Sequence, residues 1–313
     1  MKFNISVIIL IMKRILLISF LTCAVFISSN MTANAFNLNF KKAQISYEKN
    51  IKLEEKQIRE TMNSQLRFAN KHNLEGLSSI YSNNFVNNDG FDKKVYLKLV
   101  EDTWETYPDI SYNTEIKEID INGNYASVEV YETAVAVAYD TINDVKIAGE
   151  LNSFAKGIYH FEKVGNKWLM ISENMLEETS TLKYGDARYL HLHLNVPKQI
   201  PAGKDYSSTL TIDAPKNLMA IGAINREKIV YPQNKPEESF RVLSDDNRLE
   251  RIFTANDENV NEYNIASVAI ARSLGEGDDA KVYMNGAAFV MTRINVIPQN
   301  TMIKLEEENA KAK

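Results

Sequence analysis

The sequence predicts an α+β domain, in which three helices cover one face of a curved antiparallel sheet, followed by an all-β sandwich of immunoglobulin-like pattern. Apolar residues recur at the spacing of amphipathic helices between residues 47 and 107. After Pro108 the apolar period drops to two, and a hairpin at residues 157–172 closes this region. Beyond residue 186 about seven short strand-like stretches alternate with turn signals, which favours a sandwich.

Length and composition suit a soluble protein of two domains. The chain has 313 residues, of which 44% are hydrophobic and 25% charged. The formal net charge of −5 argues against a nucleic-acid partner, because such proteins normally present a basic face. Basic pairs such as Lys93-Lys94 are interleaved with acidic residues, which indicates a mixed, solvated surface.

The N-terminus has the pattern of a signal peptide at residues 1–35, with Met12 as the expected start. Lys13 and Arg14 precede an apolar run at residues 15–27, and the segment ends in the cleavage pattern Ala33-Asn34-Ala35. We expect export to the periplasm or secretion, with membrane contact only through this segment. An uncleaved anchor is the alternative. The single cysteine lies inside the signal peptide, so the mature chain is expected to hold together without disulfides.

Three helices are expected ahead of the sheet. The first follows a polar lead-in at residues 36–47, and the second is expected to end in the Asn-rich run 82–88. Asp92 is a suitable N-cap for the third helix, and Pro108 ends it. The helices are predicted at residues 47–70, 74–81 and 93–107.

An antiparallel meander is expected after Pro108. The turn Asn122-Gly123-Asn124 joins two strands, and residues 142–150 are expected as a polar crossing. Gly165-Asn166 then joins the two strands of the closing hairpin, of which the second begins with Trp168. Because Trp168 lies on a strand that should face the helices, we expect its side chain to be buried.

Residues 48–180 resemble the nuclear transport factor 2-like superfamily, which includes SnoaL-like polyketide cyclases and ketosteroid isomerases. The resemblance is carried by the helix end at residues 73–81, the turn at 122–128 and the hairpin at 157–168. It implies a cone-shaped fold with an apolar pocket between the sheet and the helices. The catalytic Tyr and Asp arrangement of the isomerases is not matched.

A change of composition at residues 181–186 predicts a linker to the second domain, residues 187–300. Prolines 215, 232 and 236 fall between the predicted strands, where they do not interrupt a ladder. The Cys and Trp pattern of antibody domains is absent, so the immunoglobulin-like assignment concerns architecture only. Residues 301–313 are expected to be a charged, frayed tail.

Three residues are candidates for acid–base chemistry. His160 is a general base if its strand face lines the cone, but alternation leaves open whether His160 or its neighbours Tyr159 and Phe161 point inward. Glu129 and Glu132 lie on opposite faces of the preceding strand. A carboxyl group buried in the cone would have a raised pKa, whereas the alternative is contact with solvent or lysines. The expected pocket residues are Tyr81, Trp104, Tyr131, Thr133, Tyr159 and Met170.

No metal site and no cofactor are expected. His191 and His193 share a strand face, but two ligands do not complete a zinc site. The acidic turn at residues 275–279 lacks the spacing of an EF-hand. Phosphate-binding loops and nucleophile elbows are also missing from the sequence.

The leading hypothesis is an exported, non-enzymatic binding or accessory protein. Its cone would hold a small apolar ligand or a partner segment, and its sandwich would contact an envelope protein. The alternative is a SnoaL-like enzyme of the isomerase, cyclase or hydratase type that acts on a hydrophobic small molecule. The two differ in the pocket, because an enzyme needs a buried ionisable group with a shifted pKa, whereas a binder can be lined by apolar side chains alone.

Overall fold

A computed structural model describes residues 32–142, 145–215, 218–232, 240–243, 246–274 and 281–298. The predicted signal peptide lies outside the described residues except for its last four, and the acidic turn and the charged tail lie outside them entirely. The chain forms two units, Met1–Lys56 and Gln57–Lys313. The hydrophobic cores and the cavity lie in the second unit.

The three predicted helices are present as α2 (Thr32–Asn70), α3 (Leu74–Ser78) and α4 (Lys93–Thr106). The predicted N-cap is confirmed, since Asp92 accepts a hydrogen bond of 2.9 Å from the Val95 backbone N–H. Residues 36–47 are not a separate lead-in but part of α2, because they contain neither glycine nor proline to end a helix. None of the helices in the described ranges is long and apolar enough to cross a membrane.

The described strands form a ten-stranded sheet and a three-stranded sheet. The larger sheet runs in the order β10-β9-β12-β13-β5-β4-β3-β2, with β1 paired to β5 and β7 paired to β13. Its strands are β1 (Tyr81–Asn87), β2 (Ser111–Asn122), β3 (Tyr125–Ile142), β4 (Val145–Val164), β5 (Lys167–Gly185), β7 (Gln199–Pro201), β9 (Met219–Lys228), β10 (Arg241–Val242), β12 (Glu262–Leu274) and β13 (Lys281–Ile297). The smaller sheet contains β11 (Arg248–Thr254), β8 (Asp205–Asp213) and β6 (His191–Asn195), and the short helix η1 (Asp186–Tyr189) precedes it.

Two segments expected to be irregular are strands. The Asn-rich run at residues 82–88 belongs largely to β1, which pairs in parallel with the first half of β5 and buries Phe85. The predicted polar crossing at 142–150 instead extends β3 and β4, which stay paired from Tyr125↔Glu162 to Ile142↔Val145. In both places the polar composition predicts a loop where the chain forms a strand. An edge strand, or one solvated face of a sheet, accepts polar residues.

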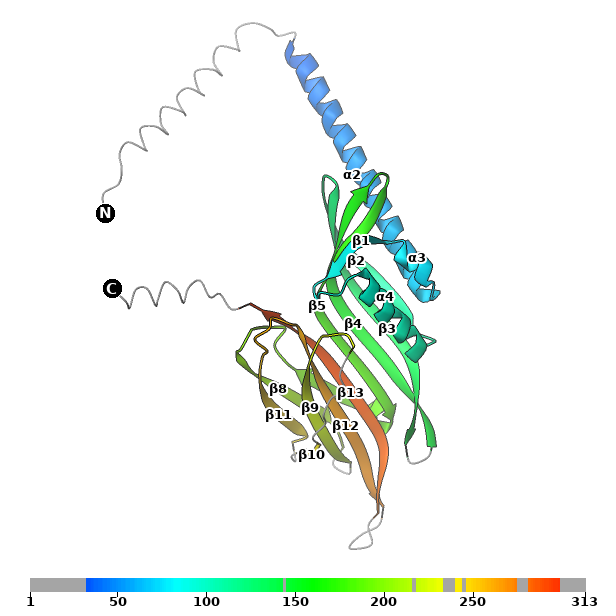
Figure 1. Ribbon diagram of the computed structural model, residues 1–313, viewed down its shortest axis with the longest axis vertical. Helices are drawn as coiled ribbons and strands as arrows, with labels where there is room; N and C mark the ends of the chain where they lie inside the picture. Colours follow the sequence, from blue (N-terminus) through cyan, green and yellow to red (C-terminus); the bar gives the residue numbers. More distant parts are fainter. Residues whose placement is uncertain are drawn as a thin grey trace, which may run out of the picture. The chain divides into compact units, whose positions relative to one another are not determined.

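The predicted linker at residues 181–186 is wrong, because residues 181–185 form the end of β5. Ser180 lies opposite Ser153 of β4 on one side and opposite Met291 of β13 on the other, and the pairing continues through Gly185. A strand paired on both sides is held by two ladders of backbone hydrogen bonds. The two predicted domains therefore share one sheet, whose helix-covered half is β2–β5 and whose C-terminal half is β9, β12 and β13 (Figure 1).

This continuity predicts the outcome of limited proteolysis. A protease cleaves a segment only after that segment has unfolded locally, and residues 179–184 would have to leave two ladders at once. We therefore expect the native protein to resist cleavage there while it is cut elsewhere, as mass spectrometry of early fragments will show. A first cut between Thr179 and Gly185 would contradict the shared sheet.

Among the described residues, the two larger of three hydrophobic clusters lie against the long sheet. The first packs α2, α3 and α4 onto the helix-covered half and contains Trp168, Tyr159 and Phe161 at 2%, 1% and 0% exposure, so the prediction for Trp168 is confirmed. The second packs the smaller sheet onto the C-terminal half through residues such as Leu210 and Ile270. The C-terminal strands thus form two packed layers, and an immunoglobulin-like topology stays a prediction.

Candidate acid–base site

One face of the long sheet forms the floor of a cavity of about 580 Å³. Directly opposed residues of antiparallel strands point to the same face. The row Ala134, Ser153, Ser180, Met291 and Ile265 consequently crosses five strands, β3, β4, β5, β13 and β12, on the cavity side. The floor therefore runs without interruption from the helix-covered half to the C-terminal half.

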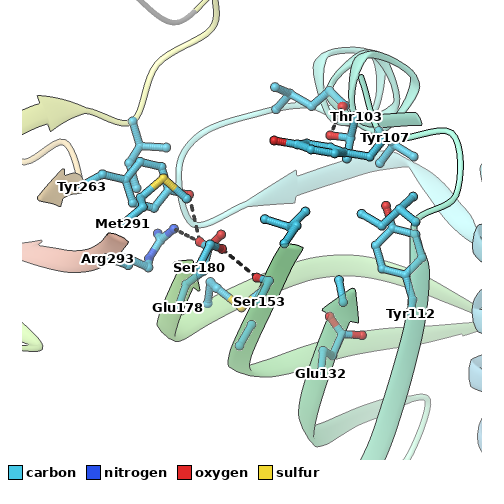
Figure 2. A pocket seen from close by; sticks show the side chains of 18 of the residues that line it. Thr103, Tyr107, Tyr112, Glu132, Ser153, Glu178, Ser180, Tyr263, Met291 and Arg293 are labelled. Carbon is cyan, nitrogen blue, oxygen red and sulfur yellow. Dashed lines mark hydrogen bonds and ion pairs between the residues drawn. The ribbon is translucent and has the colours of Figure 1, made fainter. Parts of the chain in front are cut away.

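The roof of the cavity comes mainly from α4 and the segment that follows it. Tyr96, Leu99 and Thr103 of α4 line the cavity, and Tyr107 at the C-cap continues this wall. Figure 2 shows Thr103 and Tyr107 opposite the floor residues of the sheet. A volume of this size suits a small organic molecule, since ligand pockets commonly measure about 300–1,000 Å³.

Glu132 is the predicted candidate that the structure places in the cavity wall. Thr114 Oγ1 donates a hydrogen bond of 3.0 Å to Glu132 Oε1, and the Tyr159 hydroxyl also bonds to this carboxyl group. Burial raises the pKa of Glu132, and the two hydrogen bonds oppose that rise because they stabilise the ionised form. Glu132 is therefore a carboxyl group in a largely apolar site that keeps two hydrogen-bond donors.

Glu173 on β5 also lines the cavity and was not a candidate from the sequence. It is 6% exposed, and its Oε2 atom is buried with no hydrogen-bond partner among the described residues. Burial, reinforced by the negative charge of Glu132, raises the pKa of Glu173 to about 8, while a hydrogen bond from Tyr96 opposes the rise. The carboxyl group of Glu173 is thus protonated at neutral pH.

Two irregularities in β5 explain why alternation did not find Glu173. Trp168 and Met170 point inward, so strict alternation would place Ser172 inward and Glu173 outward. The register with β4 shifts between the pairs His160↔Ser172 and Phe161↔Met170, which turns Glu173 inward. A second register shift, between Lys156 and Gly157 of β4, returns the even-numbered residues of β5 to the inner face. Glu178 therefore lines the cavity.

Three buried tyrosines surround the two carboxyl groups. Tyr159 lies directly opposite Glu173 in the β4–β5 register and bonds to Glu132. Gln65 Nε2 donates to the Tyr81 hydroxyl at 3.2 Å, and the Tyr81 and Tyr96 hydroxyls are 3.5 Å apart. Burial raises the pKa of Tyr81, Tyr96 and Tyr159, so their hydroxyls stay protonated as donors.

A second polar cluster closes the cavity where the two halves of the sheet meet. Arg293 of β13 is 3% exposed, and its Nη1 donates a hydrogen bond of 3.0 Å to Asp89 Oδ2. The Tyr263 hydroxyl donates to Glu178 Oε2 at 2.8 Å, and the same oxygen lies 3.9 Å from Arg293 Nη1 (Figure 2). Because a buried charge is costly without a partner, these pairs fix Arg293 in place.

The structure places the other sequence candidates outside the cavity wall. His160 faces away from Tyr159 and Phe161, with its Nδ1 3.0 Å from Ser127 Oγ, and Glu129 forms an ion pair of 2.9 Å with Lys156. His160 lies on the opposite face of the sheet because it alternates with Tyr159 and Phe161 on β4. Glu129 lies on that face too, because it is paired directly with Ile158, the neighbour of Tyr159. Neither residue is among those that line the cavity.

The predicted pocket wall is mostly wrong. Thr133 is one of the lining residues, but Tyr81, Trp104 and Met170 are buried in the first core instead. Tyr159 also belongs to that core and reaches the site only through Glu132. Tyr131 faces the other side of the sheet, where Lys117 Nζ lies 4.4 Å from its ring centroid.

The described part of the chain contains no group of three or more His, Cys, Asp and Glu side chains that could hold a metal ion. The cavity residues are instead carboxyl groups, hydroxyl groups, the Asn87 amide, the Arg293 guanidinium group and apolar side chains. This set can donate, accept and transfer protons.

Comparison with known proteins gives structural matches only. No protein-family model matches the chain. No curated protein matches it either. A conserved protein from Planctomyces limnophilus is 18% identical with a TM-score of 0.33, and the match covers 39% of this chain and 94% of that one.

Two further solved structures match the same share of the chain. An NTF2-like protein from Cytophaga hutchinsonii is 12% identical with a TM-score of 0.27, and the match covers 38% of this chain and 93% of that one. An LEH-like epoxide hydrolase from M. tuberculosis is 10% identical with a TM-score of 0.25, and the match covers 37% of this chain and 76% of that one. Each of these matches covers less than half of this chain and most of the other protein, and the similarity concerns the fold alone.

Proposed function

We propose that the cavity is the active site of an enzyme that moves a proton on a neutral, mainly apolar small molecule. The observation that carries this proposal is Glu173, a buried carboxyl group in the cavity wall that holds its proton at neutral pH and leaves one oxygen without a partner. Buried groups with shifted pKa values in a cavity are typical of acid–base sites. A purely apolar binding pocket would not need this costly arrangement.

The surroundings of the two carboxyl groups assign them different roles. Thr114 and Tyr159 stabilise the ionised form of Glu132, which suits a general base. Glu173 has the more strongly raised pKa and suits a hydrogen-bond donor to a developing oxyanion. In an apolar cavity such a donor acts with little competition from water.

Isomerisation of a β,γ-unsaturated ketone uses both roles in one cycle. The carboxylate of Glu132 removes a proton from the α-carbon, and the electron pair of that C–H bond moves into the C–C–O system as a dienolate. Protonated Glu173 donates a hydrogen bond to the dienolate oxygen. Glu132 then returns the proton to the γ-carbon, which gives the conjugated ketone and leaves both carboxyl groups as they began.

The test uses 3-cyclohexen-1-one, which becomes the ultraviolet-absorbing 2-cyclohexen-1-one. We expect Glu132→Gln and Glu173→Gln each to lower kcat/KM by about 10²–10⁴-fold, the usual share of general acid–base catalysis. Glu129→Gln is the matched control, since Glu129 lies on the same strand as Glu132 but on the opposite face, paired with Lys156. The wild-type rate should fall above about pH 8, where Glu173 loses its proton, and Glu173→Gln should not show this fall.

Equal rates for the wild type, Glu132→Gln and buffer would contradict the proposal. In that case the binding or accessory role becomes the better account, with the cavity as a ligand pocket. The C-terminal strands would then act as a scaffold or contact surface, in the immunoglobulin-like sense that the sequence predicts.

A further inference from the structure

The C-terminal half of the sheet supplies one whole wall of the cavity. Tyr263 and Ile265 come from β12, Phe289 and Met291 come from β13, and Ile229 follows the end of β9. Ile265 lies directly opposite Met291 in the β12–β13 register, so both point to the cavity side. These strands are therefore part of the site.

Polar and apolar groups are separated along the floor. The acid pair Glu132 and Glu173 belongs to β3 and β5 of the helix-covered half, whereas Ile265, Phe289 and Met291 form an apolar wall in the C-terminal half. Between them Ser153 Oγ and Ser180 Oγ are 2.7 Å apart and satisfy each other. A molecule lying along the floor would meet proton-transfer groups at one end and, at the other, the apolar side chains Ile265, Phe289 and Met291 beside the paired Tyr263–Glu178–Arg293 cluster.

The charges of the cavity favour a neutral occupant. Arg293 is the only cationic side chain among the described lining residues, and it is already bound to Asp89. A carboxylate or phosphate ligand would find no unpaired cation there. Glu178 accepts a hydrogen bond from Tyr263 and lies near Arg293, so it offers little charge to a cationic ligand.

We infer that the substrate is a neutral, elongated molecule with a carbonyl group at Glu132 and Glu173 and an apolar chain against Ile265, Phe289 and Met291. This inference rests on the proposed function for the carbonyl end. The C-terminal half of the sheet then selects substrates by the length of their apolar chain. Ile265, Phe289 and Met291 act as specificity residues, at a distance from the proton transfer.

The experiment compares methyl ketones of different length on the full chain. Binding of 2-pentanone and 2-undecanone is measured by ligand-observed NMR, with undecanoate and undecylamine as charged counterparts. Burial of an added methylene strengthens binding by up to about fourfold, so six added methylenes should raise affinity at least ~100-fold even with incomplete burial. We expect undecanoate and undecylamine each to bind at least ~10-fold more weakly than 2-undecanone, because each charged group loses its hydration and the cavity charges already have partners. Arg293 is bound to Asp89, and Glu132 accepts hydrogen bonds from Thr114 and Tyr159.

Ile265→Trp should abolish the gain in affinity with chain length, so that 2-undecanone binds about as weakly as 2-pentanone. Phe289→Ser is a second variant in case the first fails to fold, since Phe289 is 37% exposed and its replacement spares the core. Ile252→Trp is the matched control, because Ile252 of β11 is 75% exposed and outside the cavity wall. Turnover of 3-cyclohexen-1-one by Ile252→Trp at the wild-type rate would show that a surface tryptophan leaves the acid pair intact.

Each outcome bears on one claim. The role of the C-terminal wall is overturned if affinity still rises with chain length in both Ile265→Trp and Phe289→Ser, or does not rise in the wild type. Either result leaves the proposed acid–base function standing. Preferential binding of undecanoate or undecylamine overturns the neutral substrate class. Loss of 3-cyclohexen-1-one turnover in Glu132→Gln is independent of all these results and tests the proposed function alone.

Discussion

Replacement of Glu173 by Gln is expected to stabilise the protein increasingly as the pH rises from about 4.5 to 8. The folded protein keeps the Glu173 proton throughout this window, whereas the unfolded chain loses it near pH 4.5. The free energy of unfolding of the wild type therefore falls as the pH rises, and the neutral amide removes that fall. A pKa raised from 4.5 to about 8 corresponds to an upper limit of roughly 5 kcal/mol above pH 8.

Urea unfolding of the wild type and Glu173→Gln at pH 4, 6 and 8.5 measures this effect. The two should differ little at pH 4, where both side chains are neutral, and most at pH 8.5. Glu129→Gln controls for the loss of an ordinary carboxylate, since Glu129 is paired with Lys156 on the other face of the sheet. A difference between wild type and Glu173→Gln that does not grow with pH would mean that this carboxyl group is solvated.

Replacement of Arg293 by Met is expected to cost about 3–5 kcal/mol of stability, the usual effect of removing one partner from a buried ion pair. Arg293 is 3% exposed and bridges Asp89, which follows β1, to Glu178 on β5. Without the guanidinium group, Asp89 is left as a buried charge with only its Asn261 hydrogen bond. The cavity floor should loosen where the two halves of the sheet meet.

A double variant separates the cost of the unpaired charge from the loss of packing. Asp89→Asn combined with Arg293→Met removes both charges, and we expect it to recover more than half of the stability lost in Arg293→Met. Thermal and urea unfolding report the change. Equal stability of the single variant and the wild type would show that the ion pair is solvated and does not hold the two halves together.

Local patterns in the sequence predict much of the helix-covered half. The spacing of apolar residues and the Asp92 cap locate α4, and the Gly165-Asn166 turn locates the β4–β5 hairpin with Trp168 buried. Alternation also identifies Glu132 and Glu129 as residues on opposite faces of β3. These features depend on neighbours a few residues apart, which a single sequence contains.

Features that depend on distant partners could not be predicted. Whether residues 179–185 are a linker or a central strand is decided by β13, more than 100 residues later in the chain. Glu173 faces the cavity because the register between β5 and β4 shifts, and the periodicity of the sequence does not predict this shift. The apolar wall at Ile265 and Met291 likewise exists only because β12 and β13 join the same sheet. From the sequence, the C-terminal wall of the cavity is therefore predicted as part of a separate domain.

The most direct test of this account is the pKa of Glu173 itself. Carbon-13 NMR of the glutamate carboxyl groups, with Glu173→Gln to assign the signal, follows its titration between pH 3 and 10. The account predicts a midpoint near 8, because the carboxyl group is buried beside Glu132. A midpoint near the ordinary 4.5 would contradict the acid–base site and the function proposed from it.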